Sequence, residues 1–207
     1  MKKSIILIAL LTVMAVPGLA QHFGIQAGLL ATNVRWRNEY FTLNTIPKPG
    51  IMAGIALEIP INNNMAINTA LNYKWVGAVY NDTSEVSAIR LGYVNLDITF
   101  NYIFTDVKVV HPYVEGGTYV AYMVNSNRII NAKDDNANYD DLKVGSDETD
   151  NIIPWDFGWT IGGGVYIKKW KFGMGYQASL INLSPNNDHV LRNRVGYLRA
   201  TYFFNRN

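Results

Sequence analysis

The chain has 207 residues, of which 18 are basic and 16 acidic, and it contains no cysteine. This length suits a single domain, and the lack of cysteine excludes a disulfide framework or a thiolate metal site. Lys2 and Lys3 account for the formal net charge of +2, so the rest of the chain is neutral. A neutral chain argues against nucleic-acid binding, which depends on the neutralisation of phosphates.

Residues 1–20 are typical of a secretory signal peptide. Lys2 and Lys3 precede an uncharged apolar run, and Gly18 and Ala20 are the small residues that a signal peptidase requires. The run is shorter than the roughly 20 residues with which a helix spans a bilayer. We therefore expect export and cleavage after Ala20, which leaves residues 21–207 as one domain.

Eight later stretches of the chain alternate apolar side chains with polar side chains or glycine. Such alternation places the two sets on opposite faces of a β-strand. In chain order, we expect strands at about 21–32, 50–61, 65–76, 90–104, 112–123, 155–167, 170–182 and 194–204.

The fourth of these stretches has the clearest alternation. A typical strand has about 5–6 residues, whereas a tilted membrane strand needs roughly 9–11, and this stretch matches the longer value. The whole pattern predicts an all-β fold, an eight-stranded antiparallel transmembrane β-barrel of outer-membrane type, with outer-membrane lipid around it and a polar lumen. The uninterrupted apolar face of this strand carries Val94, Leu96, Ile98, Phe100, Tyr102 and Phe104.

The connections between the expected strands alternate in length. Short ones lie near 62–64, 105–111 and 168–169, and longer ones near 33–49, 77–89, 124–154 and 183–193. Outer-membrane barrels keep short turns in the periplasm and long loops outside. We therefore expect both ends of the mature chain in the periplasm.

The connection near 124–154 is rich in acidic residues. A cation or a partner could bind there, but an exposed run of charges is more often a solvated loop, and we favour that interpretation. Alternate oxygen-bearing residues resemble a calcium loop, yet Tyr139 replaces the required glycine and Gly145 the required glutamate. The acidic residues of interest are Asp134, Asp135, Asp140 and Asp141.

The sequence lacks the motifs of an enzyme. His22, His111 and His189 are expected at a strand start, a turn and a loop, so they are not expected to share a metal. Gly162-Gly163-Gly164 lacks the Lys-Ser or Lys-Thr of a phosphate loop, and no Gly-x-Ser-x-Gly motif occurs. The proximity in sequence of His189 to Ser184 and Asp188 is the only candidate for a catalytic group of this kind, and chance placement in a polar loop explains it better. We expect no catalytic activity, cofactor or metal.

The inward faces of the strands carry charges of both signs. Buried charges without partners are costly, and an eight-stranded interior is just wide enough to be filled by side chains. We therefore favour a structural network that plugs the lumen over an ion path along the same residues. The expected network contains Asp97, Glu115, Arg199, Asp156 and Lys74, with Asp97, Glu115 and Arg199 at its centre; Glu58 and Lys171 also face inward.

The mature chain resembles the PorT-like outer-membrane β-barrel family along essentially its whole length. The resemblance is carried by residues 23–28 (Phe-Gly-Ile-Gln-Ala-Gly), 54–60 (Gly-Ile-Ala-Leu-Glu-Ile-Pro), 112–117 (Pro-Tyr-Val-Glu-Gly-Gly), 156–159 (Asp-Phe-Gly-Trp) and the aromatic end 202–204. Asn205-Arg206-Asn207 follow that end, where many barrels stop. The resemblance implies an outer-membrane location and no shared catalytic site.

These features predict a structural or binding protein that acts through its extracellular loops, on an unknown envelope protein or an extracellular ligand. Two alternatives remain open. One is a small pore, or a subunit of an envelope transport or secretion system. The other is a soluble, lipocalin-like periplasmic barrel that binds an apolar ligand, with Val94, Leu96, Ile98 and Phe100 inside.

Overall fold

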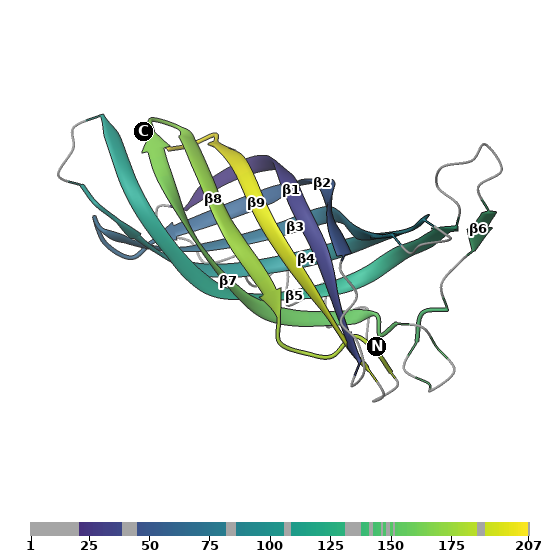
Figure 1. The fold of residues 1–207 in the computed structure, drawn as a ribbon. Coiled ribbons are helices and arrows are strands. Elements are labelled where there is room, and N and C mark those ends of the chain that lie inside the picture. The colour runs from purple at the N-terminus through teal and green to yellow at the C-terminus, as the bar shows by residue number, and fades with distance from the viewer. Residues whose placement is uncertain are drawn as a thin grey trace, which may run out of the picture.

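The computed structural model describes residues 21–38, 45–81, 86–105, 109–130, 138–140, 143–145, 147, 150, 152–185 and 189–206. Within them, eight long strands and one short strand, β6, form a single sheet (Figure 1). No helix in this part of the chain is long and apolar enough to cross a membrane. The strands are β1 (His22–Asn38), β2 (Thr45–Pro60), β3 (Met65–Asn81), β4 (Val86–Ile103), β5 (Val110–Ile130), β6 (Asn138–Asp140), β7 (Trp155–Ile167), β8 (Trp170–Ser179) and β9 (His189–Phe203).

The sheet closes into a barrel in which each long strand pairs antiparallel with two neighbours. The order is β4-β3-β2-β1-β9-β8-β7-β5, and pairing of β4 with β5 completes the ring. Strand β6 pairs only with the end of β5. Closure removes the unpaired edges that an open sheet would present to lipid. The prediction of an all-β, eight-stranded antiparallel barrel is therefore confirmed.

The two faces of the wall have opposite chemistry. On β4, Ile98 and Phe100 are 48% and 46% exposed, whereas the intervening Asp97 and Thr99 are 3% and 2% exposed. The apolar side chains thus face outward and the polar ones inward. The soluble, lipocalin-like alternative, which requires the reverse, is wrong.

Aromatic pairs border the outer apolar band at both ends of the barrel. At one end, Tyr73 contacts Trp75, and their ring centroids lie 5.6 Å apart. At the other end, the ring centroids of Trp170 and Tyr202 lie 5.0 Å apart. Outer-membrane barrels carry such aromatic girdles at the two membrane interfaces.

The strands extend further than the alternation predicted, and they do so mainly at one end. Strands β1 and β9 remain paired to Asn38 and His189, and β3 and β4 to Asn81 and Val86. Much of the loops expected at 33–49 and 77–89 is therefore strand. Hydrophobic alternation therefore underestimates the length of these strands.

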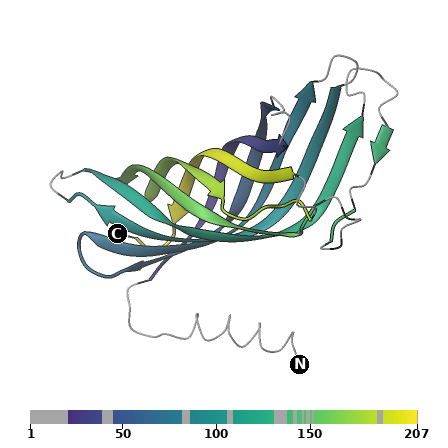
Figure 2. The same ribbon diagram turned by 60° about the horizontal axis from the view of Figure 1, so that its bottom comes forward.

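Three further features differ from expectation. Strand β8 ends at Ser179 and not at about 182, His111 lies within β5 and not in a turn, and the short strand β6 was not expected. We call the end with the long hairpins and β6 the hairpin end; Figure 2 shows β6 beside the far part of β5. We call the opposite end, with connections 61–64, 104–109 and 168–169 and both described chain ends, the turn end. Lys168 takes a positive φ of 52° there, as primed hairpin turns require.

Candidate functional site

The lumen is filled by side chains that form successive layers along the barrel axis. Charged and amide side chains fill the half near the turn end, and apolar side chains fill the half near the hairpin end. No group of three or more His, Asp or Glu side chains able to hold a metal ion occurs among the described residues.

A cluster around Glu115 lies in the half of the lumen near the turn end. Arg199 Nη2 donates to both carboxylate oxygens of Glu115, at 2.5 Å for Oε1, and Lys171 Nζ lies 3.2 Å from Oε2. Tyr197 Oη also donates to Oε1, at 2.8 Å. The side chains of Glu115 and Lys171 are 0% exposed. The Glu115 carboxylate is thus shared by two buried cations, a guanidinium and an ammonium.

Inward glycines make room for the tyrosines of this cluster. A Cβ on Gly175 would lie 2.4 Å from Tyr197 Oη, and one on Gly173 would lie 2.2 Å from Tyr113 Oη. Real Cβ contacts are not that short. The glycines of β8 are therefore required by the bulk of the side chains opposite them, in agreement with the narrow interior of an eight-stranded barrel.

Asp97 is the acceptor of the next cluster. Asn72 Nδ2 donates to its Oδ2 at 2.8 Å, and Gln177 Nε2 to its Oδ1 at 2.6 Å. Lys74 Nζ lies 3.3 Å from Asp97 Oδ2 and donates to Gln177 Oε1 at 2.7 Å. Gln26 Nε2 extends the cluster by donating to Asn72 Oδ1 at 2.5 Å. Five side chains from four strands thus cross-link the interior.

Asp156 lies in a third cluster, still nearer the hairpin end. Asn193 Nδ2 donates to Asp156 Oδ2 at 2.9 Å, and Tyr119 Oη donates to the same oxygen at 3.3 Å. Asn193 Nδ2 also contacts Tyr93 Oη at 3.3 Å. All four side chains are buried.

A fourth cluster lies at the turn end, where Arg206, after the last strand, joins side chains of β1, β2 and β7. Arg206 Nη1 donates to Glu58 Oε1 at 2.8 Å, and the guanidinium carbon lies 3.8 Å from the centroid of the Tyr166 ring. His22 Nδ1 lies 3.2 Å from the same Glu58 oxygen, and Tyr166 Oη donates to Oε2. The C-terminal extension therefore covers the mouth of the lumen.

An apolar cluster fills the lumen at the hairpin end. Ile152 and Leu183, from the connections after β6 and β8, are 4% and 0% exposed. Leu183 N donates to Leu191 O at 2.8 Å, and Ile153 N donates to Leu183 O at 2.8 Å. These bonds hold the two connections over the lumen. The cluster also contains Leu30, Val34, Met52, Val76, Leu91, Met123, Leu191 and Val195.

The five lumen residues singled out in the sequence all face inward but lie in three clusters. Lys74 and Asp97 share one cluster, Glu115 and Arg199 share the next, and Asp156 belongs to a third. Among the described residues, no hydrogen bond joins Asp97 to Glu115 or Arg199, which were expected to be central together. Sequence reasoning did not select Gln177, Tyr197, Asn72 and Asn193, although strand parity places Gln177, Tyr197 and Asn72 inside; it also gave no role to Arg206.

The acidic residues at 134, 135 and 141 lie outside the described part of the chain. Asp140 ends β6, where its Cα is paired with that of Arg128. His22, His111 and His189 lie in β1, β5 and β9.

A family model described as outer membrane protein beta-barrel domain matches residues 19–184. Among solved structures, the chain is similar to Ail, the attachment invasion locus protein of Yersinia pestis, in complex with the heparin analogue sucrose octasulfate. That similarity has 11% identity and a TM-score of 0.42, and it covers 89% of this chain and 99% of Ail. Neisserial surface protein A shares 14% identity, with a TM-score of 0.47 and coverage of 88% and 97%. No curated protein matches the chain.

The family match covers most of the chain and includes seven of the eight long strands completely. It agrees with the closed barrel, its outward apolar band and its two aromatic girdles. The chain belongs to the outer membrane protein β-barrel domain family, and the protein is located in the outer membrane.

Proposed function

We infer that the protein is a plugged, non-enzymatic barrel that binds a partner or ligand through its hairpin end, as a PorT-like member of the family. The observation that carries this proposal is the filled lumen. Glu115 and Lys171 are without solvent contact, and apolar side chains and a C-terminal arginine lie over the two mouths. A barrel whose lumen is filled can bind a partner or ligand only through its outer surfaces.

The proposed orientation follows from the unequal ends. Strands β3, β4 and β5 continue past the apolar band at the hairpin end, whereas the connections at the turn end are short. Outer-membrane barrels direct long connections outward and short turns to the periplasm. In this orientation the acidic segment with Asp134, Asp135, Asp140 and Asp141 belongs to the extracellular surface.

Conductance in a planar bilayer tests the plug. The wild-type barrel should pass no steady current, because the charged side chains of its lumen are buried and paired. A steady ohmic current from the wild-type protein would favour the alternative of a small pore.

Photo-crosslinking in intact cells tests where a partner binds. A photoreactive amino acid replaces Val124 or Arg192 at the hairpin end, or Lys168 at the turn end; all three residues are exposed. Crosslinks from the hairpin-end positions alone are expected. Crosslinks from position 168 alone would identify a periplasmic partner and favour a subunit of an envelope transport system.

A further inference from the structure

The wall of the barrel is irregular between β2 and β3, near the hairpin end. Their register shifts between Pro47 and Met52, so one stretch of β2 has no regular ladder to β3. Thr32 Oγ1 lies 2.9 Å from Lys48 O and 2.7 Å from Gly77 O, and it accepts a hydrogen bond from Gly77 N at 3.0 Å. The Thr32 hydroxyl therefore holds this bulge in place from inside the barrel.

A basic pocket lies beside this bulge. It has a volume of about 560 Å³, and its lining includes Lys48, Arg90, Asn125, Asn127 and Trp75. Lys48 Nζ is buried and has no hydrogen-bond partner in the described structure. Arg90 is exposed and forms no ion pair with any described acidic residue.

Among the described residues, no acidic side chain pairs with these two cations, and this is significant for Lys48 in particular. A buried ammonium without a counter-ion or acceptor is costly. Elsewhere in this barrel, the buried ammonium groups of Lys74 and Lys171 each lie within 3.3 Å of a carboxylate oxygen. The basic pocket is therefore the place in the described structure where an external anion would complete the charge pairing of a buried lysine.

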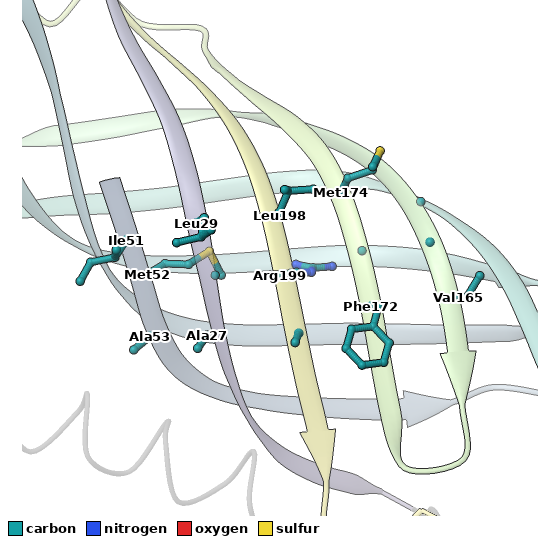
Figure 3. Close-up of a pocket in the computed structure, with 15 residues that line it drawn as sticks. Ala27, Leu29, Ile51, Met52, Ala53, Val165, Phe172, Met174, Leu198 and Arg199 are labelled. Atoms are coloured by element: carbon teal, nitrogen blue, oxygen red, sulfur yellow. The ribbon is translucent and has the colours of Figure 1, made fainter. Parts of the chain in front are cut away.

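An apolar groove continues from the basic pocket along the outer wall. It has a volume of about 1120 Å³ and crosses β2, β1, β9, β8 and β7. Leu29 and Ile51 line both the pocket and the groove. Figure 3 shows Ala27 and Ala53 on adjacent strands, where their small side chains form the floor of the groove. Phe172 lies further across the groove. A ligand of both sites needs one anionic end and one long apolar part.

The depth of the basic pocket matches a membrane interface. Trp75 Nε1 donates to Tyr73 Oη at 3.1 Å, and this pair belongs to the aromatic girdle at the hairpin end. Arg90 shares the outward face of β4 with Val94 but lies two alternate positions beyond it, past the apolar band. Aromatic girdles lie at the level of the lipid headgroups. The pocket is thus at headgroup depth and the groove at acyl-chain depth.

We propose that this composite site holds one phosphate-bearing anionic lipid of the leaflet at the hairpin end. Its phosphate lies between Lys48 and Arg90, within reach of the Asn125 and Asn127 amides, and an acyl chain follows Leu29 and Ile51 into the groove. A guanidinium and an ammonium are the usual protein donors to phosphate. The surrounding bilayer supplies the ligand, since a groove at this depth faces lipid.

Native mass spectrometry of the barrel tests the proposal. The protein is released from nanodiscs that contain equal amounts of phosphatidylcholine and phosphatidic acid with identical acyl chains. Wild type should retain one phosphatidic acid in preference to phosphatidylcholine. Each basic side chain near an anionic lipid surface contributes a factor of roughly five in affinity, so Lys48→Gln/Arg90→Gln should lower this preference about thirtyfold.

Controls separate the site from general charge and from folding. Arg192→Gln/Arg194→Gln removes two exposed cations at the same end of the barrel but outside the pocket, and it should lower the preference much less than the pocket variant does. Arg90→Gln alone, at an exposed position, should lower it about fivefold. Heat-modifiable mobility on gels verifies that each variant is folded. Equal losses in the two double variants would overturn the proposal.

A groove variant and a soluble competitor test the lipid part of the ligand. Ala27→Phe fills the groove and is expected to reduce retention of phosphatidic acid while both cations stay in place. Inorganic phosphate should compete poorly, because it gains nothing from the groove. Competition by inorganic phosphate at the lipid's own concentration would show an anion site without a lipid, and the proposal would then be wrong.

Discussion

The two halves of the lumen solve the same packing problem with different chemistry. Near the turn end, Glu115 and Asp97 each organise a cluster of cations and amides, whereas near the hairpin end the lumen is filled by aliphatic side chains such as Leu91 and Leu191. Ion pairs and hydrogen bonds require matched partners in one geometry. Apolar packing requires volume and shape and accepts many substitutions. The polar half should therefore be the less tolerant of change.

Removal of the Glu115 carboxylate should have the largest effect on stability. Glu115→Ala leaves Arg199 and Lys171 buried with no opposite charge between them, and breaking such a pair costs about 3–5 kcal/mol. Urea titration of the folded barrel in lipid vesicles measures the loss. Leu191→Met in the apolar half is the matched control, with an expected cost below about 1.5 kcal/mol. Equal losses of unfolding free energy in the two variants would contradict the proposed difference between the two halves of the lumen.

A charge on the outer face tests whether the band around both halves is in lipid. Ile98 is 48% exposed on that face, and Ile98→Arg near the middle of the band should cost about 2–4 kcal/mol. The control, Phe104→Arg directly after the same strand, lies at the band's edge and should cost about 0–1 kcal/mol. Urea titration in vesicles of defined composition measures both. If the two costs do not differ, the assigned depth is wrong.

A single methyl group tests how tightly the polar half is packed. Gly175→Ala would place a Cβ 2.4 Å from Tyr197 Oη and 2.5 Å from Ile161 O, and overpacking of this kind costs about 1–3 kcal/mol. Gly116→Ala is a matched control, since a Cβ there meets nothing within 4 Å. A loss of unfolding free energy in the first variant alone is expected; similar losses in both would indicate a general effect of glycine replacement in strands.

The sequence predicted the strands and their two faces well, because the contrast between lipid and lumen repeats every second residue. It predicted the partners inside poorly. Gln177 and Asp97 are hydrogen-bonded although 80 positions separate them; which inward residues meet depends on the stagger of the closed barrel, and parity alone does not determine that stagger. The fold was thus largely predictable, whereas the division of the network into clusters was not.

The contacts of the C-terminal extension were likewise not predictable from the sequence pattern. A substitution there should have the smallest effect on the free energy of unfolding. Arg206 has a side chain 15% exposed and binds Glu58 across the turn end, but no periodic pattern extends past Phe204. Arg206→Ala should cost about 1 kcal/mol, since a partly exposed ion pair contributes little. Arg192→Ala, an exposed arginine at the hairpin end, is the control and should be neutral. Because Arg206 lies over the mouth of the lumen, its removal should also speed hydrogen exchange at the Tyr166 and Phe203 amides. Unchanged exchange there would mean that the Glu58 cluster seals the turn end without it.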